Sequence, residues 1–114
     1  MIKVCSSQFN YLWGNQIHFP YSVGMLVSYA KTKSDISSKF KFEKTFIFRD
    51  KIVDSIKDCK DADILLCSCY VWNWEITTHL AEEVKKNNPS CLIIFGGPQV
   101  PDSDPSFFKK YLKE

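Results

Sequence analysis

Side chains suited to ligand binding follow an apolar run directly, in the stretch Ser68-Cys69-Tyr70-Val71-Trp72-Asn73-Trp74. Hydroxyl and amide groups can exchange hydrogen bonds with a ligand, and Tyr and Trp are favoured where one side of a site is apolar and the other wet. Two interpretations stay open at this point. The rings could wall a pocket for a large, flat ligand, or they could pack on a neighbouring helix and close the end of a sheet, with Asn73 capping that helix.

A second feature of this kind is Gly96-Gly97-Pro98, which follows the apolar run from Cys91 to Phe95. Two glycines allow either a sharp turn or a close approach of the backbone to a ligand. They do not form a phosphate loop, because neither G-x-G-x-x-G nor Gly-Lys-Ser/Thr is present. Ser68 taken alone is better explained as a residue that fills the core, bonded to neighbouring backbone, than as a donor to a ligand. Neither feature therefore identifies a site by itself.

Catalytic and metal chemistry have little support in the sequence. His18 and His79 are isolated, and no nucleophile–base–acid set or pair of facing carboxylates can be assembled. The spacing of the cysteines suits neither zinc nor an iron–sulfur cluster, since no C-x-x-C or C-x-x-x-C-x-x-C pattern occurs. We therefore predict no catalytic residue and no metal ligand in this chain.

The bulk composition is that of a globular domain. The chain has 114 residues, 45% of them hydrophobic and 25% charged, which fits one domain spanning residues 1–114. A net charge of +2 is too small to indicate nucleic acid or an anionic membrane as partner. No apolar run approaches the roughly 18 residues of a membrane span, and no signal peptide is evident. We expect a cytoplasmic protein whose five cysteines are reduced thiols.

Four strands are predicted from apolar patterning. Ile2 to Ser6 is short and apolar, and residues 40–48 carry Phe at one parity, as on a half-buried edge strand. Two nearly unbroken apolar runs, Ile64 to Ser68 and Cys91 to Phe95, are expected to be buried on both faces.

Four helices are predicted to alternate with these strands. The first begins at Pro20, the second is capped by Asp50, the third ends at Asn87-Asn88-Pro89 and the fourth begins at Asp104-Pro105. Their apolar stripes are, in order, Val23, Leu26, Val27 and Ala30; Ile52, Val53 and Ile56; Ile76, Leu80, Ala81 and Val84; and Phe107, Phe108 and Tyr111. Residues 7–19 are expected to form an irregular loop.

This alternation predicts an α/β fold: a three-layer, flavodoxin- or Rossmann-like parallel sheet of strand order 2-1-3-4 that lacks the usual fifth strand. Ligands of such sheets bind beyond the carboxyl ends of the strands. The loops at that end are residues 7–19, 70–75 and 96–101. The aromatic cluster and the glycine pair are therefore expected at the same rim.

Taken together, these features resemble a known pattern. Cobalamin-binding domains of the methionine-synthase and mutase type carry Asp-x-His-x-x-Gly after the first strand, Ser-x-Leu after the third and Gly-Gly after the fourth. The chain is more similar still to the N-terminal cobalamin-binding domains of radical S-adenosylmethionine (SAM) enzymes. The similar stretches are Pro20-Tyr21-Ser22-Val23-Gly24, Ser68-Cys69-Tyr70-Val71-Trp72-Asn73-Trp74 and Phe95-Gly96-Gly97-Pro98-Gln99-Val100-Pro101.

The resemblance implies that cobalamin lies over the rim, with its nucleotide tail running into the sheet. Ser68 would donate to the tail, Gly96-Gly97 would let it pass against bare backbone, and Trp72 and Trp74 would shield the corrin edge. The cofactor-binding residues implied in this way are Gln8, Phe9, Asn10, Tyr21, Ser68, Tyr70, Trp72, Asn73, Trp74, Gly96, Gly97, Pro98 and Gln99. A corrin is large and amphipathic, so aromatic walls with amide donors suit it.

The chain departs from the pattern in two respects. The stretch from Gln8 to Gly14 holds no histidine, so the resemblance implies cobalt bound without a protein imidazole. The fifth strand and the domain that would carry the iron–sulfur cluster and SAM are missing. We therefore expect a fragment or truncated form of a larger, methyltransferase-like radical enzyme, whose downstream domain would be a partner.

The alternative is an α/β interaction domain that keeps the fold without binding a cofactor. In both cases the fourth strand would be an edge, and apolar edges invite pairing with another chain. We therefore predict a homodimer through this edge, or a helix folded over it.

Overall fold

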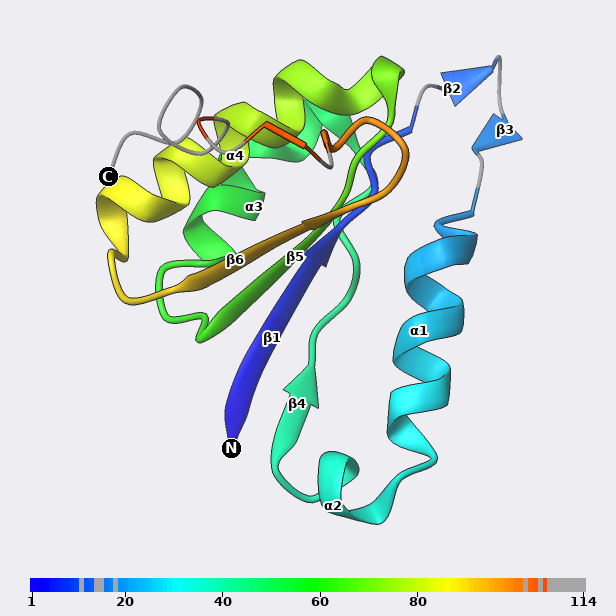
Figure 1. Ribbon diagram of the computed structural model, residues 1–114, viewed down its shortest axis with the longest axis vertical. Helices are drawn as coiled ribbons and strands as arrows, with labels where there is room; N and C mark the ends of the chain where they lie inside the picture. Colours follow the sequence, from blue (N-terminus) through cyan, green and yellow to red (C-terminus); the bar gives the residue numbers. More distant parts are fainter. Residues whose placement is uncertain (11, 14–15, 18, 102, 105, 107–114) are drawn as a thin grey trace.

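The computed structural model of the chain describes residues 1–10, 12–13, 16–17, 19–101, 103–104 and 106. Four strands, β1 (Ile2–Ser7), β4 (Phe40–Phe42), β5 (Ile64–Ser68) and β6 (Leu92–Gly96), form one parallel sheet in the order β4-β1-β5-β6. Counted along the chain as predicted, this order is 2-1-3-4, so the predicted fold class is confirmed. Figure 1 shows the carboxyl ends of these strands meeting at one edge of the sheet.

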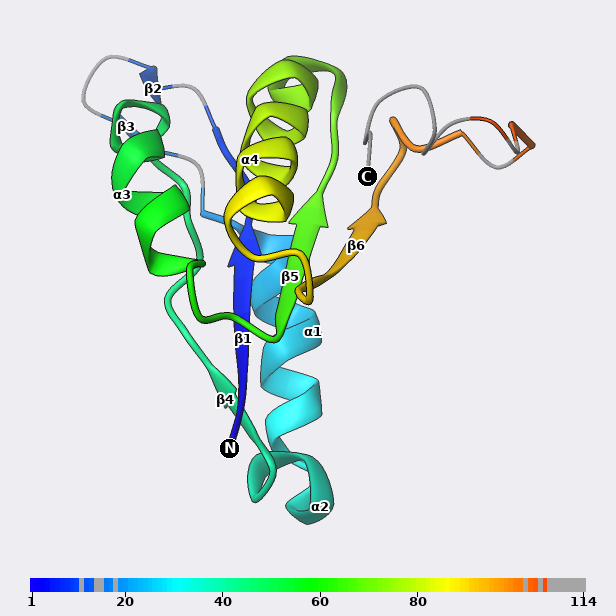
Figure 2. The same cartoon turned by 90° about the vertical axis from the view of Figure 1, so that its left-hand side faces the viewer.

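Helices cover both faces of this sheet (Figure 2). α3 (Ile52–Asp58) and α4 (Trp74–Asn87) lie on one face, and α1 (Tyr21–Lys31) lies on the other. The short helix α2 (Ser34–Ser37) and the 3-10 turns η1 (Arg49–Lys51) and η2 (Val71–Asn73) complete the connections. Among the described residues, no helix is long and apolar enough to cross a membrane.

The core lies between the sheet and the pair α3–α4. Alternate residues of β5 point into it, so that Leu65 and Cys67 are buried, and Leu80 and Val84 of α4 pack against them. All five cysteines are free thiols, and all are buried. They act as small apolar side chains of this core, as expected for reduced cysteine.

The opposite face is less covered than predicted. Leu92 and Ile94 of β6 are 55% and 46% exposed, so the prediction that this strand is buried on both faces is wrong. The reason is that α1 stands off the sheet: Val23 is its one buried residue, while Leu26 of the predicted stripe is 70% exposed. Ile64 and Leu66 of β5 are only half-buried on this face for the same reason.

The predicted strand over residues 40–48 is interrupted. Its first part ends at Phe42, opposite Val4, and pairing with β1 resumes only at Phe46, opposite Ser7. The edge strand thus advances by one residue more than β1, which is the definition of a β-bulge. The Phe46 amide donates to Ser6 O at 2.8 Å, and the Gln8 amide donates to Phe46 O at 2.9 Å.

Local predictions failed at several element boundaries. Asp50 does not cap a helix: it lies within η1, and α3 begins two residues later with no side-chain cap. This turn rotates the helix, so that Val53 is 60% exposed and Ser55 is buried instead. α1 begins at Tyr21, one residue after Pro20. The predicted loop over residues 7–19 contains a small hairpin, β2 (Leu12–Trp13) and β3 (Gln16–Ile17). His18 and most of the predicted fourth helix lie outside the described residues.

The buried thiols make stability depend on alkaline pH. Burial raises the pKa of Cys69 to about 12, whereas an unfolded thiol ionises near about 8.5. Between these two pKa values the thiol is ionised in the unfolded state but still protonated in the folded state. The free energy of unfolding therefore falls as pH rises, and each such thiol contributes about 1.4 kcal/mol per pH unit to this fall. We expect Cys69→Ala to flatten this fall, measured by urea unfolding from about pH 9 to pH 11. The exposed control Ser90→Ala should keep the wild-type slope; equal slopes in all three proteins would contradict the prediction.

Candidate functional site

The structure brings most of the predicted site residues to one rim. Gln8 and Asn10 follow β1, Tyr70 to Trp74 follow β5, and Gly97 to Gln99 follow β6. Ser68 and Gly96 are register partners in the last pair of β5 and β6. Parallel pairing alone accounts for this convergence, because all three strands end at the same edge of the sheet.

The side chain of Asn73 fastens this rim together. Its amide nitrogen donates to Phe9 O at 3.2 Å and to Ser68 O at 3.0 Å. Its amide oxygen accepts a bond of 2.8 Å from the Tyr70 backbone N–H. Asn73 occupies the N-cap position of α4, as predicted, but it makes no capping hydrogen bond. It is fully buried and instead joins the loops after β1 and β5.

Gly97 holds the third loop against the second. Its φ of +106° lies in the region that favours glycine, and a Cβ placed there would lie 2.5 Å from Cys69 O. The Cys69 amide donates to Gly96 O at 2.7 Å, which closes the contact between the two loops. Gly96 differs, because a Cβ at this position would meet no atom within 4 Å. The first of the two glycines thus leaves open space, and the second allows a close approach of backbone.

The aromatic residues have separate roles. The rings of Tyr70 and Trp72 stack with centroids 4.5 Å apart, and Trp72 remains 44% exposed. Tyr70 also shares a hydrogen bond of 3.0 Å with the hydroxyl of Ser22, which ties the start of α1 to the rim. Trp74 is half-buried and meets Phe95 edge-on. Of the two interpretations that the sequence left open, packing accounts for Trp74, while Tyr70 and Trp72 lie on the open side of the rim.

A groove of about 220 Å³ runs between α1 and the ends of β5 and β6. Four of the predicted residues line it: Ser68, Tyr70, Gly96 and Gly97. Its other walls come from Ser22, Val23, Leu26 and Val27 of α1, and from Leu66, Cys67 and Ile94 of the sheet. It exists because α1 touches the sheet mainly through Val23. Among the residues that the structure describes, no charged side chain lines it.

Other predicted residues do not line this groove. Phe9 is fully buried in the core, and Tyr21 is 72% exposed at the start of α1. Gln8 and Asn10 are buried beside the rim, and within the described part of the chain the Gln8 side-chain oxygen has no hydrogen-bond donor.

Sequence reasoning missed Leu66 and Ile94 as groove residues. They could have been predicted from the alternation of side chains along a strand. Leu66 precedes Ser68 by two positions and Ile94 precedes Gly96 by two positions, so each pair lies on the same face of the sheet.

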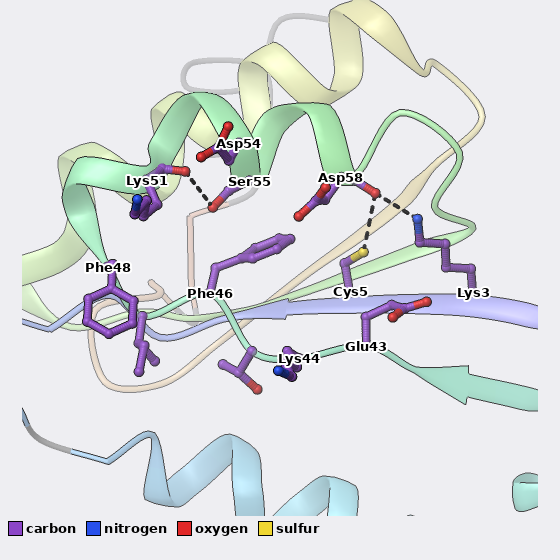
Figure 3. A pocket seen from close by; sticks show the side chains of 12 residues that line it. Lys3, Cys5, Glu43, Lys44, Phe46, Phe48, Lys51, Asp54, Ser55 and Asp58 are labelled. Carbon is purple, nitrogen blue, oxygen red and sulfur yellow. Dashed lines mark hydrogen bonds between the residues drawn. The ribbon is translucent and has the colours of Figure 1, made fainter.

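A larger cavity, of about 620 Å³, lies beside α3, and none of the described residues lines both this cavity and the groove (Figure 3). It opens between α3 and the bulged segment 43–48, and its walls mix Lys3, Glu43, Lys51 and Asp58 with Phe46 and Phe48. None of the predicted site residues lines it. Lys3 donates to the backbone carbonyl of Asp58 at 2.8 Å and pairs with the Asp61 carboxylate at 2.6 Å. The groove at the carboxyl rim therefore remains the candidate site.

Metal-binding chemistry is not evident at this rim. Among the described residues, no group of three His, Cys, Asp or Glu side chains could hold a metal ion.

These features define a class: an open, parallel α/β domain with a groove at the carboxyl ends of its strands. No family model matches the chain. It is 32% identical over 92 residues to the 2-(S-pantetheinyl)-carbapenam-3-carboxylate methyltransferase of Streptantibioticus cattleyicolor. It is likewise 32% identical over 92 residues to the cobalamin-dependent radical SAM methyltransferase TokK of Streptomyces tokunonensis.

Each alignment covers 81% of this chain and 14% of the enzyme. The chain is thus similar in sequence to a cobalamin-dependent radical SAM methyltransferase, as its motifs predicted, and it spans about one seventh of the length of these relatives.

We expect loss of the Asn73 amide to loosen the whole rim. Asn73→Ala would leave Tyr70 N–H, Phe9 O and Ser68 O without a partner, and buried unpaired groups cost about 1–3 kcal/mol each. We predict a decrease of about 3 kcal/mol in the free energy of unfolding, measured by urea denaturation. The control Asn87→Ala, at the exposed end of α4, should change stability by less than about 0.5 kcal/mol. Equal stability of the two variants would show that the amide bonds contribute nothing.

Proposed function

We propose that the chain is a cobalamin-binding module that holds the corrinoid at the carboxyl ends of its strands. The observation that carries this proposal is the groove in which Ser68 lies beside Gly96 and Gly97, in a chain related to a cobalamin-dependent enzyme. We expect no catalysis from the described residues themselves. When bound, cobalamin would supply a cobalt centre able to carry a methyl group.

The residues present fit such a group. Within the described part of the chain, the hydroxyl of Ser68 has no hydrogen-bond partner, although its carbonyl is bonded to Asn73. Gly96 beside it leaves open space where any other residue would place a Cβ. A free donor next to bare backbone suits the insertion of a nucleotide tail between α1 and the sheet.

The predicted site residues then divide into two groups. Ser68, Gly96 and Gly97 would contact the tail, and the stacked pair Tyr70–Trp72 would border the corrin ring. We propose that Gln8, Asn10, Tyr21, Pro98 and Gln99, which lie on the segments that follow the strands of the rim or begin α1, would meet the corrin periphery. Phe9, Asn73 and Trp74 are positioning residues, because their side chains pack or bond within the protein.

We further propose that the cobalt has no histidine ligand from this chain. Gln8 to Asn10, the described start of the first loop, holds no histidine, and His79 lies exposed on α4. The residues proposed to hold the corrinoid would therefore act on its tail and on the edge of its ring.

The module would serve a larger reaction. We propose that it acts with a radical SAM domain that carries the iron–sulfur cluster and SAM, and that the complete enzyme transfers methyl groups, as the names of the relatives suggest. The five free, buried thiols fit a reducing compartment, so we place the protein in the cytoplasm.

Titration with hydroxocobalamin tests the binding proposal. We expect a shifted corrin absorption spectrum and a higher melting temperature, since a ligand that binds only the folded state stabilises it. Gly96→Ala and Ser68→Val should weaken binding about tenfold without unfolding the domain, because the first narrows the groove and the second removes its donor. Leu92→Ala, on the same strand but outside the groove, is the matched control. A spectrum and melting temperature unchanged at saturating cobalamin would refute the proposal.

A second candidate function is protein association through the edge of β6. It is favoured by the exposure of Leu92 and Ile94, which form an apolar strip along this edge. If the strip mediates a homodimer, Leu92→Lys should shift the protein toward monomer in sedimentation velocity at equal concentration, while Lys41→Glu on the opposite edge strand should not. A wild-type protein that stays monomeric over a hundredfold range of concentration would exclude this function.

A further inference from the structure

The bulge before Phe46 turns this ring toward α3. Phe42 lies beside Val4 and Phe46 lies beside Ser7, so the edge segment takes four steps while β1 takes three. Four steps along a regular strand would keep both rings on one face of the sheet, but the extra residue puts them on opposite faces. Lys31 at the end of α1 lies over the ring of Phe42, whereas Phe46 packs against the core on the other face. The bulge therefore gives the cavity beside α3 its aromatic wall.

This cavity of about 620 Å³ has an apolar side and a charged opening. Its apolar side consists of Phe46, Phe48 and the buried Cys5, and Figure 3 shows the Phe46 ring pointing toward α3. The Phe48 side chain belongs to a residue that remains 45% exposed. The volume lies within the range of about 300–1,000 Å³ that is typical of small-molecule pockets. There is thus room for a second ligand away from the groove at the carboxyl rim.

Four charged side chains at this cavity are left without partners. They are two cations and two anions: Lys44, Lys51, Asp54 and Asp58. Within the described part of the chain, none of these side chains forms an ion pair or a hydrogen bond, whereas Lys3 and Glu43 are each held in an ion pair. A ligand of a single charge would meet like charges here, and a neutral ligand would displace water from charges without replacing it. A ligand that carries one ammonium and one carboxylate group suits both pairs.

The spacing of the charges indicates how long the ligand is. Lys51 and Asp58 are seven positions apart, which is two helical turns and on the order of 10 Å along the axis. A free amino acid carries both charged groups on one carbon, so its charges lie much closer together than this. An extended chain of two or three residues spans roughly 7–10 Å and carries an ammonium at one end and a carboxylate at the other. A short peptide therefore matches the separation of the charges.

We propose that the cavity between α3 and the bulged segment 43–48 is a second ligand site, which binds a short peptide with free termini and an apolar side chain. The peptide carboxylate lies at Lys44 and Lys51, and the ammonium lies at Asp54 and Asp58. Backbone amides of the bulge support this assignment: those of Lys44 and Thr45 donate no hydrogen bond within the described residues, and peptide carbonyls can accept from them. The cavity shares no described lining residue with the groove, so this inference does not depend on corrinoid binding.

The experiment titrates the purified, ¹⁵N-labelled chain with the tripeptide Gly-Phe-Gly. Three further ligands each lack one feature: the N-acetylated tripeptide has no ammonium, the C-amidated tripeptide has no carboxylate, and triglycine has no apolar side chain. Backbone amide chemical shifts locate the site on the chain and give a dissociation constant for each ligand. The four ligands have the same backbone length, so differences between them report the missing group.

We expect Gly-Phe-Gly to shift amides of residues 43–48 and 51–58, and each of the other three ligands to bind about fivefold more weakly. No shift at about 10 mM tripeptide, or shifts confined to other residues, would overturn the site. Equal binding of the two blocked forms and the free tripeptide would overturn the assignment of the charges. Equal binding of triglycine would overturn the role of the aromatic wall.

Two variants test which end of the peptide each charge holds. Lys51→Gln should weaken Gly-Phe-Gly about fivefold and leave the C-amidated form unchanged, because that form has no carboxylate to lose. Asp58→Asn should weaken Gly-Phe-Gly to a similar extent and leave the N-acetylated form unchanged. Lys57→Gln is the matched control, since Lys57 lies exposed on α3 and outside the cavity, and it should bind all four ligands as the wild type does. Melting temperatures check that the variants fold, and wild-type affinity in folded Lys51→Gln and Asp58→Asn proteins would refute the assignment.

Discussion

One buried amide determines the geometry of the candidate site. The side chain of Asn73 joins backbone groups that follow β1 and β5, and it is fully buried while doing so. A buried polar group that loses its hydrogen-bond partner raises the free energy of the folded state. Removing the Asn73 amide would therefore leave backbone groups unpaired in the loops after both β1 and β5. The loop after β6 is then added through Gly97, which lies against the backbone of Cys69. The loops of the rim are thus joined by main-chain groups and by the Asn73 amide, whereas the Ser68 hydroxyl has no hydrogen-bond partner among the described residues.

The two faces of the sheet serve different purposes. On the α3–α4 face, cysteine, leucine and valine side chains are packed to full burial and supply most of the stability. On the α1 face, apolar residues stay exposed and a groove remains open. Local departures from good packing are expected where a protein binds something, because the site must be vacant before the ligand arrives. The groove proposed to hold the corrinoid lies on this less covered face.

The fold could be predicted from the sequence because parallel strands and their helices repeat a clear pattern, and Ser68 and Gly96-Gly97 could be placed from their positions at strand ends. Details that depend on tertiary packing could not. The helical period of α1 indicates a buried stripe, yet the distance between α1 and the sheet leaves Leu26 in solvent. Periodicity cannot register the extra residue of the bulge before Phe46. Asn73 was placed correctly at the start of α4, but its bond to the carbonyl of Phe9 spans 64 positions and has no local signal.

The loose seating of α1 has a consequence for dynamics. This helix is anchored by one buried valine and by the hydroxyl pair Ser22–Tyr70, and several of its apolar side chains gain little from the folded state. Its opening therefore requires far less free energy than opening of α4, so its amide hydrogens exchange with solvent through local fluctuation, not global unfolding. A molecule lying between α1 and the strands would add the contacts that the sheet does not provide. Occupancy of the groove and order in this helix are then two aspects of a single equilibrium.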